Sequence, residues 1–491
     1  ISNKKGVQQT MGLQRNLEKL NEAFRGGYPL IYILSWEEDR VEKTLRVMRE
    51  KLIGDGCFAV WTCASGLKGL SEKNKLATSS SEAIDEVINS QQKGIYLLKK
   101  LRDAYYALKG KKKYIVILSP KYLLPEQLRK EVHLIEFDLP DENEVYDCIQ
   151  PILNLLVKNE NLTDDYVKEL SMAMKGLTLN EAIHTVNKIF SKNVSLSEGM
   201  DNVFREKEQI VRKEGILEFV PPRYSISDIG GLDTLKEWLI KRANLFTRKA
   251  LEADMPVPRG ILLMGVSGCG KSLGIKVISS LWKVPLFRLD MNLVFSGVLG
   301  SPESVFHKAL KQLEAMAPAI LWIDEIEMGV AGYREGETVT SAHIFAHFLT
   351  WMQEKDTMVF VGATANRINL LPAEIIRKGR FDQIFFIDLP NHEERKQIFS
   401  IHIKKNGGDP NLFDLVFLSA ATKGWNGSEI EQAVISARVD AFYEGRQFHF
   451  DDVIRNTSKI IPLSQTMESQ IKQIKSWAFQ RAVPASGKFI R

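Results

Sequence analysis

One stretch constrains the fold of this chain more than any other: residues 265–272 read Gly-Val-Ser-Gly-Cys-Gly-Lys-Ser. They match the phosphate-binding pattern G-x-x-x-x-G-K-[ST] at every fixed position. A short apolar run at 260–264 precedes the stretch, and a helical pattern over 273–281 follows it. A strand, a glycine-rich loop and a helix in this order form the setting in which the pattern binds nucleotide phosphates. The sequence therefore predicts an α/β fold with a phosphate-binding loop, and ATP as its ligand.

Within this loop, backbone N–H groups can surround phosphate oxygens, while a lysine amine and a serine hydroxyl reach the outer phosphates and a metal ion. We therefore predict that Lys271 binds the phosphates and that Ser272 is a ligand of Mg²⁺. We interpret Cys269 as a small residue that fills a tight loop, with a thiol pKa lowered by the start of the helix as the alternative. The other predicted phosphate-binding residues are Gly265, Val266, Ser267, Gly268, Cys269, Gly270 and Leu273.

A second apolar run, at 319–323, ends in the acidic pair Asp324 and Glu325. In a nucleotide site Asp324 would hold Mg²⁺, directly or through water, and Glu325 would polarise the attacking water as general base. Acids also favour an ordinary helix start, because they interact well with the helix dipole. With the phosphate loop upstream, the catalytic interpretation is preferred.

Composition sets broad limits. A length of 491 residues predicts two to four domains. The net charge of +5 is small for this length, so nucleic-acid binding is compatible with it but not indicated. No apolar run approaches the roughly 18 residues of a membrane span. Four scattered cysteines favour a reducing, cytoplasmic compartment over a disulfide framework.

The first half of the chain has the pattern of a second α/β sheet, because apolar runs alternate with helical segments. The segment after the first run, 35–40, reads Ser-Trp-Glu-Glu-Asp-Arg; it has no glycine, and its acids would repel phosphate. The predicted strands are 30–34, 57–61, 94–98, 114–118 and 134–137.

Two blocks of the first half are similar to blocks of the second. Residues 134–144 echo 385–394, and residues 174–183 echo 422–430 at nearly the same separation. This predicts a duplicated unit of sheet plus helical lid, whose first copy lacks the nucleotide motifs. Chance similarity between common α/β segments is the alternative.

Three further motifs accompany the loop and the acidic pair. Residues 228–232 read Asp-Ile-Gly-Gly-Leu, residues 258–260 read Pro-Arg-Gly, and residues 361–367 read Val-Gly-Ala-Thr-Ala-Asn-Arg. Together they make residues 224–461 similar to the AAA ATPases. The resemblance implies a three-layer P-loop sheet with a helical AAA lid, preceded by a degenerate AAA-like α/β unit. It also implies that the backbone of Asp228, Ile229 and Gly230 contacts adenine.

The same resemblance assigns roles to residues near the end of the sheet and in the lid. Asn366 takes the place of the first sensor, whose amide orients the attacking water. Arg377 and Arg380 take the place of arginine fingers, which reach the neighbouring subunit's site. Gly427 and Ser428 fall at the second sensor, close to the sugar and base.

Nearly the whole chain resembles one group of AAA-domain proteins, encoded as a hypothetical chloroplast reading frame in algal plastids, cyanobacteria and other bacteria. This implies a homo-oligomer, a hexameric ring, in the bacterial cytosol or, for an alga, in the plastid stroma. One departure from the AAA unfoldases concerns the first pore loop, where Val298 stands at the position that is usually aromatic. The resemblance therefore does not extend to the residue that grips a threaded polypeptide.

These inferences give a domain plan and a function. The predicted parts are a degenerate domain with its lid at 1–204, a linker at 205–223, the ATPase core at 224–390, a helical lid at 391–461, and a helix and tail at 462–491. The expected function is ATP hydrolysis that remodels or regulates a protein partner through a nucleotide-driven ring. The alternatives are a nucleotide-gated recruitment switch with slow turnover and a nucleic-acid remodelling ATPase.

Overall fold

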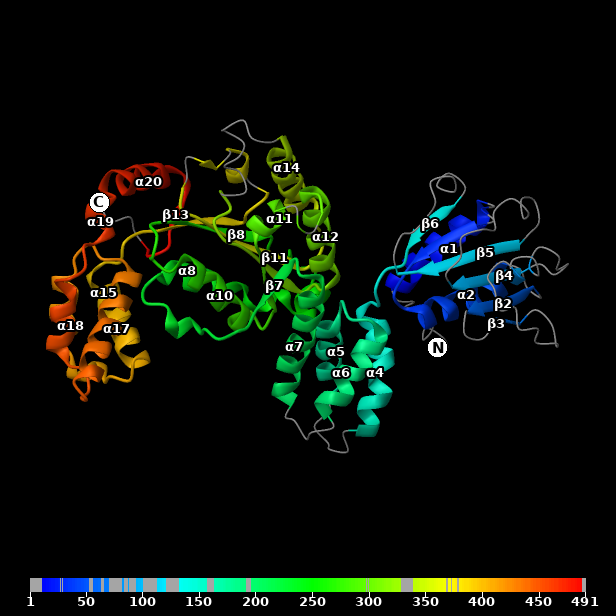
Figure 1. The fold of residues 1–491 in the computed structure, drawn as a ribbon, viewed down its shortest axis with the longest axis horizontal. Helices are drawn as coiled ribbons and strands as arrows, with labels where there is room; N and C mark the ends of the chain where they lie inside the picture. The colour runs from blue at the N-terminus through cyan, green and yellow to red at the C-terminus, as the bar shows by residue number, and fades with distance from the viewer. Residues whose placement is uncertain are drawn as a thin grey trace. The chain divides into compact units, whose positions relative to one another are not determined.

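The computed structural model separates into two compact units, residues 1–200 and 201–491 (Figure 1). Each unit has its own sheet and its own helical bundle. The structure describes residues 11–26, 28, 30–52, 56–62, 66–69, 82–83, 87, 94–99, 113–120, 132–156, 163–190, 196–296, 298, 300–327, 339–367, 370–371, 373–377 and 379–487.

The sheet of the first unit has the strand order β3-β2-β4-β5-β1-β6. All its pairings are parallel except that of β3 with β2. The five predicted strands are confirmed, and the short strand β3 is an addition that the sequence pattern did not reveal. The strands are β1 (Leu30–Leu34), β2 (Cys57–Thr62), β3 (Gly66–Lys68), β4 (Gly94–Lys99), β5 (Lys113–Ser119) and β6 (His133–Glu136).

Helices cover this sheet and follow it. Helices α1 (Met11–Arg25) and α2 (Glu38–Leu52) bury Leu20 and Leu45 in one apolar core with the strands. A bundle follows the last strand, made of α4 (Glu142–Leu156), α5 (Asp164–Met174) and α6 (Leu179–Phe190). Helix α7 (Leu196–Glu214) then leads into the second unit.

The sheet of the second unit has the order β13-β12-β8-β11-β10-β9-β7, with β7 antiparallel to β9 and the other pairings parallel. Every residue of β8, β10 and β11 is buried, as expected for strands covered on both faces. The strands are β7 (Leu217–Val220), β8 (Gly260–Gly265), β9 (Leu286–Leu289), β10 (Ala319–Ile323), β11 (Val359–Ala365), β12 (Gln383–Ile387) and β13 (Val483–Pro484).

Helices on both faces make this unit three layers deep. Helices α12 (Pro302–Ala315) and α14 (Val339–Glu354) bury Phe306 and Phe348 against one face. Helices α8 (Asp233–Arg242) and α10 (Lys271–Trp282) bury Leu235 and Ile275 against the other. Short helices α9 (Arg248–Glu252) and α11 (Met291–Phe295) complete the layers. The predicted fold class is therefore confirmed.

A helical lid follows β12 and has a separate core that contains Phe399, Trp425 and Phe448. It consists of α15 (His392–Lys405), α16 (Leu415–Ala421), α17 (Gly427–Tyr443) and α18 (Phe450–Thr457). The last part of the chain forms α19 (Leu463–Thr466), α20 (Glu468–Arg481) and then β13, where the sequence predicted one helix and a tail.

The two units share one topology. Strands β6-β1-β5-β4-β2 of the first sheet follow the same connectivity as β12-β8-β11-β10-β9 of the second. The corresponding lid helices begin with the same device: Glu181 accepts from the backbone of Thr178 before α6, as Glu429 does from Asn426 before α17. These likenesses favour duplication over chance similarity.

The predicted linker at 205–223 takes a different form. Helix α7 continues to Glu214, and β7 pairs with β9 at the edge of the second sheet. Val211, Leu217 and Phe219 are buried, so the charges that suggested a linker belong to exposed faces of a packed segment. None of the helices that the structure describes has the length and hydropathy of a membrane span.

Candidate nucleotide-binding site

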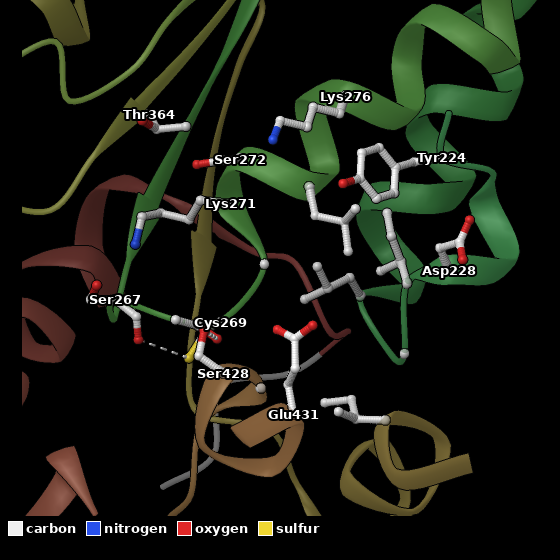
Figure 2. Close-up of a pocket in the computed structure, with 18 of the residues that line it drawn as sticks. Tyr224, Asp228, Ser267, Cys269, Lys271, Ser272, Lys276, Thr364, Ser428 and Glu431 are labelled. Atoms are coloured by element: carbon white, nitrogen blue, oxygen red, sulfur yellow. Dashed lines mark hydrogen bonds between the residues drawn. The ribbon is translucent and has the colours of Figure 1, made fainter. Parts of the chain in front are cut away.

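The second unit contains a pocket of about 420 Å³ between the carboxyl ends of central strands and the lid helices α15 and α17 (Figure 2). Parallel α/β sheets bind ligands at this edge. Figure 2 shows Lys271, Ser272 and Thr364 on one side, Tyr224 and Asp228 on the other, and Ser428 and Glu431 on the lid helix. The predicted site residues in the lining are Asp228, Ile229, Gly230, Ser267, Gly268, Cys269, Gly270, Lys271, Ser272, Leu273, Asp324, Glu325, Asn366, Gly427 and Ser428.

The loop between β8 and α10 depends on glycine at two close approaches. Gly265 has a φ of 145°, and a Cβ there would lie 2.0 Å from the carbonyl oxygen of Ile387. Gly268 has a φ of 76°, and a Cβ there would lie 2.8 Å from the side chain of Asn426. The N–H of Ser428 donates to the Gly268 carbonyl over 3.1 Å. The loop therefore contacts both the sheet and the lid. Two predicted phosphate-binding residues of this segment, Gly265 and Val266, do not line the pocket.

Lys271 is buried, with 6% of its surface exposed. Its Nζ donates to the carbonyl oxygens of Gly265 and Val266 over 3.1 and 2.8 Å. Burial lowers the pKa of Lys271, and the acids Glu327, Asp324 and Glu325 oppose this effect. A cation enclosed by the loop is well suited to neutralise phosphate.

The residues predicted to hold a metal lie together. Ser272 Oγ and Thr364 Oγ1 donate to Asp324 Oδ1 over 3.2 and 2.6 Å. Hydroxyl and carboxylate oxygens are the hard donors that Mg²⁺ prefers, so this set fits the ion. The sequence analysis missed Thr364, although a hydroxyl inside the apolar strand β11 was a usable signal.

Glu325 is held from two sides. Its N–H donates to Thr364 Oγ1 over 2.9 Å, and its Oε1 accepts from Asn366 Nδ2 over 2.7 Å. Its φ of 48° lies in the left-handed region, which is strained for a residue other than glycine and often marks a functional position. The structure thus places the predicted base and the predicted water-orienting amide in direct contact.

Glu327 fixes the backbone that carries Asn366. Its Oε1 accepts from the backbone N–H groups of Asn366 and Arg367 over 2.7 and 3.1 Å. Only 1% of its surface is exposed, and burial raises the pKa of its carboxyl group. Sequence reasoning stopped at the acidic pair and missed this residue two positions further on.

The opposite end of the pocket is built by the 228–232 motif and the lid. Asp228 forms a 2.8 Å ion pair with Lys405 of α15. The Lys405 amine also lies 5.8 Å from the centre of the Tyr224 ring. An aromatic ring and apolar side chains here could receive a base. Sequence analysis missed these lining residues: Tyr224, Leu232, Lys276, Ile398, Ile401, His402, Lys405 and Glu431.

The predicted arginine fingers lie outside this pocket. Arg377 is exposed, and the Arg380 guanidinium donates to the Glu374 carbonyl. Arg259 of the 258–260 motif holds the segment between them, because its Nη1 donates to the Gly379 carbonyl over 2.8 Å. The arginines therefore do not complete the pocket of their own subunit.

The alternative that the helix start lowers the pKa of Cys269 is wrong, and the interpretation as a small loop residue stands. Burial of the sulfur raises the pKa of this thiol to about 12, and the Lys271 ammonium opposes the shift only in part. Loss of water around the thiolate outweighs the favourable effects of the helix dipole and of Lys271.

We therefore expect Cys269 to react about 10²-fold more slowly than a free thiol with iodoacetamide at pH 8, since only the thiolate attacks. Its rate should rise as pH rises toward 12. Mass spectrometry of the folded protein, with glutathione in the same tube as reference, measures both rates. Alkylation as fast as that of glutathione would contradict the raised pKa.

A phosphate loop after β8, an acidic pair after β10 and a helical lid define the second unit as a P-loop nucleoside triphosphatase. The family model described as "ATPase family associated with various cellular activities (AAA)" matches residues 261–389. The model of the SpoVK-like AAA ATPase N-terminal domain matches residues 16–137. The chain belongs to the AAA ATPase family, in the group that includes the AAA domain-containing protein ycf46.

Relatives extend over nearly the whole chain. The protein described as uncharacterized AAA domain-containing protein ycf46 of Trieres chinensis is 36% identical, covering 92% of this chain and 94% of its own. That of Pyropia yezoensis is 35% identical, covering 94% and 97%. The proteasome-activating nucleotidase of Saccharolobus solfataricus is 26% identical over 70% of this chain and 89% of its own.

Proposed function

We propose that this protein is a Mg²⁺-dependent ATPase that converts ATP to ADP and phosphate and uses the cycle to remodel or regulate a protein partner. The observation that carries the proposal is the convergence of one cation, two metal-type ligands, a carboxylate and an amide on one pocket: Lys271, Ser272, Asp324, Glu325 and Asn366. Family membership supports the same chemistry.

Each group has a proposed role. Lys271 neutralises the outer phosphates, and the backbone N–H groups of residues 266–271 enclose them. Glu325 accepts a proton from the attacking water, which Asn366 orients through its amide. Ser272 and Asp324 would hold Mg²⁺, which when bound supplies charge neutralisation at the phosphate oxygens.

The proposed assembly is a homo-oligomeric ring, which we take to be a hexamer. Arg377 and Arg380 support this, because arginine fingers act on a neighbouring subunit's site and neither arginine lines the pocket of its own subunit. One relative is named a proteasome-activating nucleotidase, which supports a role directed at another protein. The proposed location is the bacterial cytosol, or the plastid stroma for an algal protein.

Replacing Lys271 by alanine tests nucleotide binding. We expect the K271A variant to lose ATP affinity by 10²-fold or more, because the buried cation that faces the phosphates is removed. Titration with a fluorescent ATP analogue measures it, with the exposed Lys308→Ala as control. Unchanged ATP affinity in K271A would contradict the assignment of residues 265–272 as a phosphate-binding loop, and with it the proposed function.

A nucleotide-gated recruitment switch is the second candidate. It is favoured by Val298, a residue 79% exposed at the position where a threading pore loop has an aromatic side chain. In that function ATP binding orders an assembly that recruits a partner, and hydrolysis only resets it.

A further inference from the structure

The first unit repeats the topology of the second but replaces its phosphate loop. Between β8 and α10 the second unit has five residues, Val266–Gly270, whereas between β1 and α2 the first has three, Ser35–Glu37. The shorter connection has no glycine and brings the Glu37 side chain to the start of α2. A backbone cradle for phosphate is therefore not available there.

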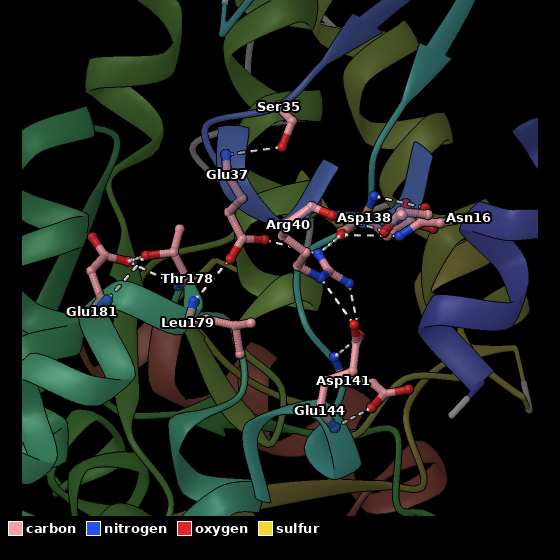
Figure 3. A network of polar contacts seen from close by, with 11 residues as sticks. Asn16, Ser35, Glu37, Arg40, Asp138, Asp141, Glu144, Thr178, Leu179 and Glu181 are labelled. Carbon is pink, nitrogen blue, oxygen red and sulfur yellow. Dashed lines mark hydrogen bonds and ion pairs between the residues drawn. The ribbon is translucent and has the colours of Figure 1, made fainter. Parts of the chain in front are cut away.

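Glu37 instead contacts the lid of its own unit (Figure 3). Its Oε1 accepts from the backbone N–H of Leu179, the first residue of α6, over 2.9 Å. In the second unit the corresponding helix start, at Ser428, donates its N–H to the phosphate-loop carbonyl of Gly268. The carboxylate thus forms the contact between loop and lid helix that a main-chain carbonyl forms in the other unit.

Arg40 ties this contact to a second lid helix. Its Nη1 donates to Glu37 Oε2 over 2.8 Å, and its Nε and Nη2 form a bidentate pair with Glu144 of α4 over 3.0 and 2.7 Å. Its Nη1 also donates to the Asp138 carbonyl, where the chain leaves β6. One guanidinium therefore links α2, the end of the sheet and the lid (Figure 3).

This network is buried. The side chains of Arg40, Glu37 and Glu144 are 6%, 7% and 11% exposed. Removing one partner of a buried ion pair leaves an uncompensated charge and is strongly destabilising. The arrangement of these elements is consequently set by charges that the chain itself supplies.

A pocket of about 520 Å³ beside the network has the wrong charge for phosphate. Its lining contains four carboxylates, Glu37, Asp39, Glu144 and Asp147. The basic side chains of the lining are Arg40, which two carboxylates already neutralise, and Lys43. Nucleoside triphosphates would be repelled from this lining.

We propose that Glu37 and Arg40 are built-in ligands of the degenerate site, which hold α4 and α6 of the first unit against its sheet without any nucleotide. The first unit is then a module whose shape stays constant through the ATP cycle of the second. The first unit then stays rigid while nucleotide binding changes the shape of other parts of the chain. The contacts of Glu37 and Arg40 do not depend on hydrolysis by the second unit, whereas the constant shape through the ATP cycle rests on the proposed function.

Hydrogen–deuterium exchange of the full-length protein tests the proposal. In the wild type, exchange in residues 142–190 should be the same with and without ATP and Mg²⁺. The Glu37→Ala variant should exchange about 10²–10³-fold faster at Leu179 and along α4 and α6, the factor expected for a broken buried ion pair. Glu37→Gln, which keeps an acceptor oxygen, should give a smaller increase, and Glu42→Gln, which breaks an exposed pair with Arg46 on the same helix, should give none.

Three results would overturn the proposal. The first is slower exchange at residues 35–40 or at Leu179 when ATP is added to the K271A variant. Because the second unit of this variant should not bind ATP, the first unit would then bind nucleotide itself. Exchange in Glu37→Ala could be as slow as in Glu42→Gln, which would mean that Glu37 does not hold α4 and α6 against the sheet. Both Glu37 variants could speed exchange equally in strands β1 and β5, which would mean that the pair stabilises the sheet and not the lid contact.

Discussion

Replacing Glu325 by glutamine should lower ATP turnover by about 10²–10⁴-fold, the contribution of a general base, and leave ATP binding intact. Glutamine has nearly the same shape and can still accept from the Asn366 amide, so the pocket should be preserved. Only the ability to take a proton from water is lost. Steady-state phosphate release and ATP titration, measured on the same preparation, separate the two effects.

Glu303→Gln is the matched control for this variant, because Glu303 is an exposed acid at the start of α12 and away from the pocket. It should hydrolyse ATP at the wild-type rate. If Glu325→Gln also turned ATP over at that rate, Glu325 would not be the base. A variant that lost ATP binding as well would point to damage to the pocket.

The same variant distinguishes the two proposed functions. A chain that binds ATP but cannot release phosphate should stay in the ATP-bound state. If a protein partner co-purifies with the Glu325→Gln variant and the partner remains active, the recruitment switch is favoured. If it retains the partner but the partner's activity is lost, remodelling driven by hydrolysis is favoured.

Arg380→Ala should reduce turnover by about 10³–10⁵-fold, the effect of removing an arginine finger, with ATP affinity within a few fold of wild type. Turnover should fall while ATP affinity is kept, because Arg380 does not line the pocket of its own subunit. Arg212→Ala, which removes an arginine exposed on α7, should have little effect and serves as control.

Mixing two inactive variants provides a sharper test of the arginine. In a ring of Glu325→Gln and Arg380→Ala subunits, an Arg380→Ala subunit next to a Glu325→Gln subunit has an intact base and an intact neighbouring arginine. Random assembly should restore activity at about a quarter of the interfaces. A mixture as inactive as either variant alone would exclude a pocket shared between subunits.

Residues of this site that belong to a contiguous sequence motif were predictable, whereas residues brought together only by folding were not. Lys271 and Ser272 are placed by a contiguous pattern, because a phosphate loop requires its residues at fixed spacing. Thr364 and Glu327 have no such pattern. Their roles arise only when β11 pairs with β10 and brings Thr364 to the carboxyl of Asp324.

The lid side of the pocket was harder still. Lys405 and Glu431 come from helices whose packing on the sheet no local pattern reports, and each resembles an ordinary surface charge on a helix. The alternative of a lowered pKa for Cys269 was wrong for a similar reason, since the sequence shows the helix start but not the atoms packed around the sulfur. In the first unit, the acids after β1 predicted loss of phosphate binding, but their pairing with Arg40 required the tertiary structure.

Strands β7 and β13 form the two borders of the second sheet, and both lie outside residues 224–461. A fragment trimmed to those residues would leave β9 and β12 with open rows of backbone donors and acceptors, which invite pairing between molecules. Recombinant pieces of this ATPase should therefore start before α7 and continue past residue 484. Aggregation of a shorter fragment would reflect the exposed sheet edges and not the behaviour of the intact protein.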